Sequence, residues 1–388
     1  MIDKELTRQI IGWRRRLHQI PEIGNDLPQT SGYVQAVLDE HGIDYALYVN
    51  GNGIVATIEG SSEGACVALR GDMDGLIITE QTGLDFASEN GHMHACGHDG
   101  HTAMALGAAV YLKQHNDFSG SVKVFFQPGE EAPGGAKPMI DEGALEGIDA
   151  IFGLHHGNFE PEIPKGSFGV RPGPLMAAPD TFEIKILGKG GHGGLPDKAV
   201  DPIIIGSHLV QAFQTLVSRE SKPTDPVVIS VTQFISGTAH NIIPNEALLG
   251  GTVRTVSHDT REFVALRMQE LADSIAHGFR GEVDFSYEFN YPPLINDAEA
   301  TELAMTSAAE IVGEDRVVLL DGPMMASEDF SFYLERIPGC FMHLSNPQAV
   351  DGVSYPLHHP KFTFDEAYLE VGTSYLIQVA LAYLRQNK

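Results

Sequence analysis

Side chains that bind metals or transfer protons crowd into the short stretch between His94 and His101. They are His94, Cys96, His98, Asp99 and His101. Thiolate, imidazole and carboxylate groups are the usual ligands of zinc and of its neighbours in the first transition series. Cys96 and His98 lie two residues apart, and in a loop or at a strand terminus this spacing can turn both side chains toward one cavity. The pair alone is weak evidence because it can arise by chance, but its flanking residues favour a metal site.

A pair of adjacent carboxylates, Glu130 and Glu131, follows an apolar segment and a Pro-Gly turn. Such pairs on exposed loops are commonly just solvated. Here the apolar segment predicts that the pair emerges at the end of a strand. Two carboxylates this close repel each other unless cations lie between them. One could therefore bind a metal while the other takes a proton from metal-bound water.

Two histidine pairs, His155-His156 and His358-His359, complete the candidate ligands. Each pair alone would more often be an ordinary surface or core feature. Together, the four segments supply one thiolate, several imidazoles and two carboxylates. This set is large enough to hold two metal ions that share a ligand and a bridging water.

A glycine-rich stretch surrounds His192, from Gly188 to Gly194. The glycines would let the backbone fold closely around this histidine, although a simple hairpin turn explains them equally well. The stretch is not a nucleotide-binding fingerprint, because no helix follows it directly. Asn241 and Arg254 add an amide and a guanidinium to the same region. Arg254 could hold a carboxylate through two hydrogen bonds, and a surface salt bridge is the simpler interpretation.

The segments that carry the first group of side chains alternate between helix and strand. Apolar runs bounded by glycine and serine predict strands, and periodic segments between them predict helices. The predicted strands span 53–58, 66–69, 122–126 and 148–154. This alternation predicts a mostly parallel sheet. The candidate ligands lie just past the carboxyl ends of its strands, where open α/β sheets place their sites.

The pattern changes near Pro179 and then follows the order β-α-β-β-α-β, which is typical of a ferredoxin-like arrangement. The predicted strands span 181–187, 227–234, 248–256 and 283–289, and the predicted helices span 201–218 and 260–278. Two further helices, at 297–311 and 366–385, follow a break at Pro292. We therefore predict an α/β catalytic domain over 1–179 and 292–388, with an α+β domain inserted at 180–291.

Composition limits the classes of partner. The chain has 388 residues and a formal net charge of -27, which argues against nucleic acid and anionic membranes as partners. Three cysteines do not form a disulfide framework, and Cys66 and Cys340 are predicted to be buried strand residues. The N-terminus has no apolar signal segment and no long apolar run follows, so we expect a cytoplasmic protein.

Taken together, these motifs resemble the M20 metallopeptidase family, in its aminoacylase and hippurate hydrolase branch. The matching segments keep their order and span nearly the whole chain: Arg16 to His18, Ala68 to Asp74, Met93 to Thr102, Gln127 to Glu131, Gly153 to His155, Gly190 to Gly193, Asn241 to Pro244, Gly251 to Arg254, Ala326 to Phe330 and Leu357 to Pro360. Two departures are Ile77, where relatives usually carry proline, and Gly129, where alanine is usual. Neither residue is a proposed ligand.

The resemblance implies a zinc-peptidase-like catalytic domain and a smaller lid domain that is often used for dimerisation. It implies that Cys96 bridges two metal ions and that Glu130 is the general base. The remaining metal ligands would be His98, Glu131, His155 and His358.

The resemblance also assigns roles in the inserted domain and beside the ligands. His192 would stabilise the oxyanion, in some relatives from the other subunit. Asn241 and Arg254 would receive the carboxylate of the substrate. His94 and His101 keep supporting roles, and Asp99 is expected to orient a ligand without touching the metal.

We therefore expect hydrolysis of the amide bond of N-acyl amino acids, such as N-acetyl or N-benzoyl derivatives. The cofactors would be two divalent ions per subunit, zinc or manganese, with cobalt and nickel also compatible. One alternative is a dipeptidase or carboxypeptidase with the same site. A more distant one is a non-enzymatic binding protein on the same fold. The expected partners are a small-molecule substrate and a second copy bound through the lid domain.

Overall fold

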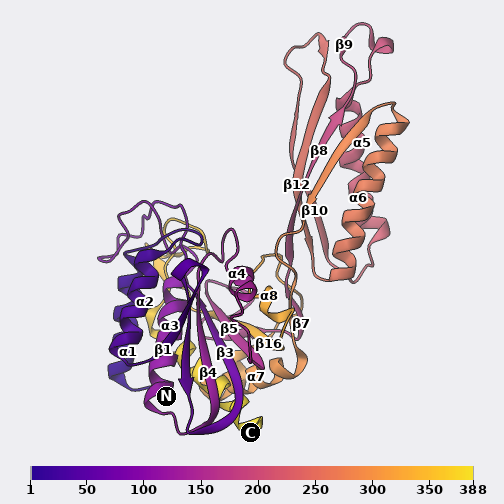
Figure 1. The fold of residues 1–388 in the computed structure, drawn as a ribbon. Helices are drawn as coiled ribbons and strands as arrows, with labels where there is room; N and C mark the ends of the chain where they lie inside the picture. Colours follow the sequence, from indigo (N-terminus) through magenta and orange to yellow (C-terminus); the bar gives the residue numbers. More distant parts are fainter. Residues whose placement is uncertain (1, 388) are drawn as a thin grey trace. The chain divides into compact units, whose positions relative to one another are not determined.

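The computed structural model describes residues 2–387, which divide into two compact units (Figure 1). The first unit comprises Met1–Gly173, Ile295–Gly322 and Glu328–Lys388, and the second comprises Pro174–Leu294 and Pro323–Ser327. The second unit is therefore wider than the predicted insertion at 180–291. Its short second segment belongs there because the Ala177 backbone N–H donates to the carbonyls of Met324 and Ala326, at 3.1 and 2.9 Å.

An eight-stranded sheet forms the centre of the first unit, in the order β1-β2-β4-β3-β5-β16-β6-β15. Four neighbouring pairs are parallel (β4 with β3, β3 with β5, β5 with β16, β6 with β15) and the others are antiparallel. The strands are β1 Asp44–Tyr48, β2 Gly53–Glu59, β3 Ser62–Asp72, β4 Ser119–Gln127, β5 Ala150–Gly157, β6 Phe168–Val170, β15 Val317–Leu319 and β16 Gly339–Ser345. The predicted mostly parallel sheet is confirmed.

Helices flank this sheet (Figure 1). They are α1 Lys4–His18, α2 Pro28–Glu40, α3 His98–Gln114, α4 Ala136–Asp141, α7 Ala298–Val312, α8 Ser331–Leu334 and α9 Leu369–Gln386. Helix α3 is buried on nearly every side because it packs against β3, α1 and α9. Its small residues allow this close packing: a Cβ atom at Gly107 would overlap Ile10 of α1. The helix that begins at His98 is thus closely packed on several sides.

The second unit is a four-stranded antiparallel sheet, in the order β10-β12-β8-β13, with two helices. Its elements are β8 Ala178–Leu187, α5 Pro202–Thr215 with a π-helical turn at Leu216–Glu220, β10 Val227–Ser236, β12 Glu246–Thr255, α6 His258–Gly278 and β13 Glu282–Glu288. Burial alternates along β8, because one face of the sheet packs on the helices and the other is open. This order confirms the ferredoxin-like arrangement.

The remaining strands are short, and the sequence did not predict them. They are β7 Gly173–Met176, β9 Gly191–His192, β11 Ile242–Ile243, β14 Leu294–Asn296, β17 Ala349–Val350 and β18 Val353–Ser354. Ladders of two to four residues are too short to show an alternating pattern.

The two cysteines predicted to be buried differ. Cys340 is fully buried in β16, as predicted, but Cys66 is only partly buried because β3 begins at an exposed end of the sheet. Among residues 2–387, no helix is long and apolar enough to cross a membrane.

Candidate metal centre

The structure brings together all five predicted metal ligands from four segments of the first unit. Cys96 lies in the loop before α3, and His98 is the first residue of that helix. Glu131 lies in the loop after β4, and His358 lies in the loop after β18. His155 lies inside β5 rather than past its end, because the parallel ladder with β16 continues to Gly157.

Two groups of three ligand atoms share the sulfur of Cys96. The first group is Cys96, His98 and His155, and the second is Cys96, Glu131 and His358; within each group the atoms all lie within 4.8 Å of one another. The Cys96 Sγ atom is 3.3 Å from the Nε2 atoms of both His155 and His358. The Nε2 atom of His358 is 2.9 Å from Glu131 Oε1. This arrangement fits two metal ions bridged by one thiolate.

The hydrogen bonds around the histidines leave the correct nitrogen for a metal. His98 Nδ1 is 3.2 Å from Asp74 Oδ1, and His155 Nδ1 is 2.9 Å from the carbonyl of His156. A proton on Nδ1 satisfies both contacts and leaves the lone pair on Nε2, as in metal-bound histidines. The Nε2 atom of His98 is buried and makes no hydrogen bond within residues 2–387. A metal ion bound to this Nε2 atom would supply the partner that it lacks.

Asp74 connects this histidine to the carboxylate loop. Its two oxygens accept hydrogen bonds from the backbone N–H groups of Glu130 and Glu131, at 3.0 and 3.1 Å, while Oδ1 also faces His98. One buried carboxylate therefore contacts candidate ligands from two segments. We did not predict this role from the sequence, although Asp74 ends the matching segment Ala68 to Asp74 and lies just after β3.

The other residues of the His94–His101 stretch have structural partners. His101 Nδ1 is 2.6 Å from Asp72 Oδ1, and its Nε2 accepts the backbone N–H of His156 at 2.9 Å. Burial lowers the pKa of His101, so the neutral ring can both donate and accept. His94 Nδ1 lies 3.1 Å from the backbone oxygen of Asp74. Both histidines thus contact residues next to the candidate ligands.

The expectation that Asp99 orients a metal ligand is wrong. Its carboxylate instead pairs with the Nε atom of Arg14, at 2.7 Å, and with the Nδ1 atom of His18, at 2.8 Å. All three side chains are buried. Asp99 therefore attaches the start of α3 to α1, while Asp74 orients His98.

Glu130 lies in a buried cluster of carboxylates beside one arginine. Its neighbours include Glu328 and Asp329, whose oxygens lie within 4.8 Å of its own. Burial raises the pKa of Glu130 well above its usual range, the negative charges of Glu328, Glu131 and Asp329 raise it further, and Arg70 opposes the shift. A carboxylate that holds protons readily is suited to general acid–base chemistry.

The residues predicted to contact the substrate belong to the second unit. His192 is exposed on β9 and pairs with Ile242 of β11, and the carbonyl of Asn241 accepts the Gly193 N–H at 2.8 Å. His192 and Asn241 therefore lie on one small two-stranded ribbon. Arg254, on β12, donates to the carbonyls of Met325 and Val253, both at 3.2 Å, and to Thr252 Oγ1.

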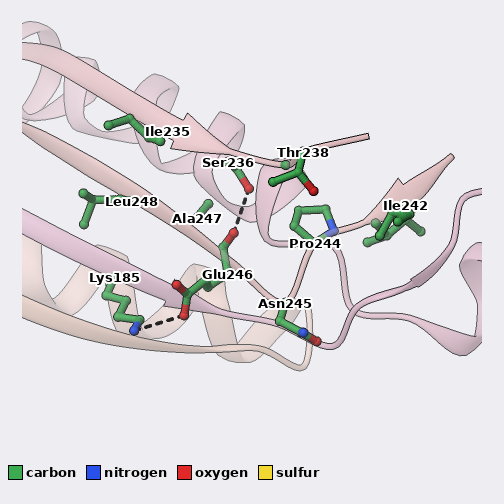
Figure 2. Close-up of a pocket in the computed structure, with 12 residues that line it drawn as sticks. Lys185, Ile235, Ser236, Thr238, Ile242, Pro244, Asn245, Glu246, Ala247 and Leu248 are labelled. Atoms are coloured by element: carbon green, nitrogen blue, oxygen red, sulfur yellow. Dashed lines mark hydrogen bonds and ion pairs between the residues drawn. The ribbon is translucent and has the colours of Figure 1, made fainter. Parts of the chain in front are cut away.

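A cavity of about 750 Å³ in the second unit lies at the end of β10 and β12 (Figure 2). Its apolar lining includes Ile235, Leu248 and Ile242, and Lys185 pairs with Glu246 at 3.0 Å beside it. None of the predicted substrate-contacting residues lines this cavity. It is lined instead by Ile242, Ile243 and Pro244, which directly follow Asn241 in one of the matching segments.

The chain is similar to known metal-dependent peptidases and deacetylases in sequence and in fold. The model of peptidase family M20/M25/M40 matches residues 68–382. An N-acetyl-L-cysteine deacetylase of Bacillus subtilis is 40% identical over 386 residues, covering 99% of this chain and 90% of that protein. Thermostable carboxypeptidase 1 of Saccharolobus solfataricus is 38% identical, covering 99% and 97%. The crystal structure of the Bacillus subtilis YXEP protein, a dinuclear metal-binding peptidase of the M20 family, has a TM-score of 0.86 and 34% identity, with 99% of each chain covered.

Proposed function

Because this chain belongs to peptidase family M20/M25/M40 and is a metal-dependent hydrolase of amide bonds, we propose that it releases amino acids from their N-acyl derivatives. The observation that carries the proposal is the sharing of Cys96 between two ligand groups, with Glu130 beside them. A dinuclear site with an adjacent carboxylate is suited to hydrolysis. The N-acyl class is supported by relatives named for deacylation, at 40% and 37% identity.

Five residues would hold the metal ions: Cys96, His98, Glu131, His155 and His358. Two divalent ions bound there would lower the pKa of a shared water and polarise the amide carbonyl. The mixed sulfur, nitrogen and oxygen donors favour zinc, and manganese, cobalt and nickel are also compatible. Asp74 would keep His98 and the Glu131 loop in place throughout.

Glu130 would move the protons. Its carboxylate accepts a proton as water adds to the carbonyl carbon, and returns it to the nitrogen as the carbon–nitrogen bond breaks. The products are a carboxylic acid and a free amino acid. From the second unit, His192 would stabilise the oxyanion, and Asn241 and Arg254 would bind the substrate carboxylate.

A pair of adjacent substitutions tests the role of Glu130. Glu130→Gln should keep the wild-type metal content and lower kcat by about 1,000-fold, since general acid–base catalysis contributes about 10² to 10⁴. Glu131→Gln, one residue further along, should lose metal as well as turnover. Metal analysis and kcat measured on the same samples separate the two outcomes. Wild-type turnover in Glu130→Gln would overturn the assignment.

The competing function is a carboxypeptidase or dipeptidase with the same metal centre. It is favoured by the carboxypeptidase relatives, which match this chain at 38% identity over nearly its full length. A panel that compares N-acetyl and N-benzoyl amino acids with dipeptides, each measured as kcat/KM, discriminates between them. Higher kcat/KM for the N-acyl compounds supports our proposal, and higher values for peptides support the alternative.

We also propose that two copies associate through the second unit. Strand β10 is an edge of its sheet and carries no charged residue between Val227 and Ser236. Val228 and Ile235 on this strand are 39% and 62% exposed. An uncharged edge strand with exposed apolar side chains favours pairing with another strand.

A further inference from the structure

The loop between β4 and α4 carries both Glu130 and Glu131, and a single side chain from a distant segment holds its two ends. At its start, Gln127 Nε2 donates to both oxygens of Asp329, each at 2.8 Å. At its end, the backbone N–H groups of Gly135 and Ala136 both donate to Asp329 Oδ2 at 2.9 Å. Asp329 lies about 200 residues further along the chain and is fully buried.

The same residue also reaches the carboxylate of Glu130. The Asp329 backbone N–H donates to Glu130 Oε1 at 3.4 Å. The Asp329 side chain therefore contacts both ends of the loop, and its backbone N–H contacts the Glu130 carboxylate. The two ends of the loop approach closely, because a Cβ atom at Gly135 would overlap the carbonyl oxygen of Pro128.

Buried partners fix the orientation of Asp329. Arg70 Nη2 donates to Asp329 Oδ1 at 2.9 Å. Arg70 Nε and the Tyr333 hydroxyl both donate to Gln127 Oε1, at 2.9 and 3.1 Å. The Gln127 amide can then face Asp329 only with its NH₂ group. Each of these hydrogen bonds to the Asp329 carboxylate thus comes from a fixed donor.

We propose that Asp329 is a positioning residue that sets the location of the Glu130 carboxylate by clamping the 128–136 loop. The inference rests on the proposed role of Glu130 in amide hydrolysis. A general base displaced by about 1 Å can lose about 100-fold in rate. The hydrogen bonds of the Asp329 carboxylate go to Arg70, Gln127 and the loop backbone, and only its backbone N–H reaches Glu130, so its side chain acts through the loop.

Asp329→Asn tests the clamp with the smallest change of shape. An asparagine amide must point its NH₂ group at Arg70 and Gln127 or at the Gly135 and Ala136 N–H groups, so donor faces donor in either orientation. The matched control is Glu328→Gln. Glu328 is equally buried, also pairs with Arg70, at 3.0 Å, and lies beside Glu130, but it makes no hydrogen bond to the loop backbone.

Two measurements on the full-length, metal-reconstituted protein decide the question. Asp329→Asn should lower kcat by about 100-fold on N-acyl amino acids with KM within about threefold. Glu328→Gln also removes a negative charge beside Glu130, so hydrogen exchange, and not kcat, separates the two variants. Amide hydrogen exchange of a peptide spanning 128–137 should accelerate in Asp329→Asn and stay at the wild-type rate in Glu328→Gln. Unchanged exchange in Asp329→Asn, equally accelerated exchange in Glu328→Gln, or wild-type kcat in Asp329→Asn would overturn the proposal.

A second variant, Asp329→Glu, keeps the proposal testable if Asp329→Asn does not fold. Asp329→Glu keeps the negative charge beside Arg70 but moves the carboxylate by one methylene group, and it should show the same two effects. Hydrogen exchange is independent of turnover. If the wild-type protein hydrolyses no N-acyl amino acid, the proposed function fails, while faster exchange in Asp329→Asn still supports the clamp.

Discussion

At the scale of single residues, the candidate metal centre depends on Cys96 more than on any other ligand. The Cys96 sulfur is the only ligand atom that belongs to both groups of three, while His155 and His358 each belong to one. The sulfur lies 3.3 Å from each of these two histidines. Removal of the shared donor should therefore weaken both metal positions, whereas removal of a histidine should weaken one.

Metal stoichiometry measures this difference directly. After reconstitution with zinc, the wild-type chain should hold about two ions, His358→Ala about one, and Cys96→Ala less than one. Cys340→Ala is the matched control, because this thiol is equally buried but lies in β16 and contacts a backbone carbonyl. Elemental analysis after gel filtration gives the counts. Two ions retained by Cys96→Ala would contradict a shared thiolate.

The five candidate ligands that the structure brings together were predicted from the sequence, but the residues that hold them in place were not. The Cys96-x-His98 spacing and the Glu130-Glu131 pair have a chemical signature in adjacent positions. Asp74 and Asp329 lie in the matching segments Ala68 to Asp74 and Ala326 to Phe330, but their roles are not visible there, because they accept from backbone N–H groups 56 and more than 190 residues away. Only the folded chain brings such acceptors to these donors. The roles of His192, Asn241 and Arg254 remain predictions.

At the scale of secondary-structure elements, one buried ion pair connects three elements of the second unit. Asp180 of β8 accepts from Arg261 of α6 at 2.8 and 2.6 Å. It also accepts from the Tyr287 hydroxyl of β13 at 3.1 Å and from the Asn290 N–H at 3.0 Å. Both ends of the pair are buried. Loss of the carboxylate would leave the guanidinium buried without its counter-charge.

Asp180→Asn should therefore lower the free energy of unfolding by about 3 to 5 kcal/mol. The comparison is Lys185→Met, which removes the exposed Lys185–Glu246 pair from the same strand and should cost about 1 kcal/mol or less. Denaturant titration of each variant gives the two free energies. Similar small changes in both variants would show that the buried pair does not hold these elements together.

Helices and strands were predicted correctly where their apolar runs or helical periods extend over many residues. Strands β4 and β5, with continuous apolar runs, and helix α6, with its regular period, appear close to the expected positions. Strand β1 was not predicted from the sequence, and its burial does not follow a simple alternation. The missed strands β6 and β15 have three residues each, and tertiary pairing alone defines them.

At the scale of the whole molecule, a net charge of -27 opposes association of two copies. A stable contact must therefore avoid acidic surface. The two edges of the second sheet differ in this respect: β13 carries Glu282, Asp284 and Glu288, whereas β10 carries no charge. Charged side chains protect an edge from pairing. Of the two edges, β10 therefore has the lower electrostatic cost of dimerisation. Two copies that pair through this same strand form a two-fold symmetric dimer, in which neither copy keeps a free β10 edge for a third.

We predict a dimer that dissociates when charged residues are introduced on the β10 edge. Val228→Lys combined with Ile235→Lys should give a monomer, because each lysine would meet a like charge from the partner copy or lose its hydration. Ser286→Lys on β13 is the control and should leave the mass unchanged. Sedimentation velocity at low and high salt measures the mass of each protein.

The wild-type dimer should strengthen with salt, since screening reduces the repulsion between two acidic chains. A monomeric wild-type protein at both salt concentrations would refute the dimer, and a dimer that survives both lysines would place the contact elsewhere.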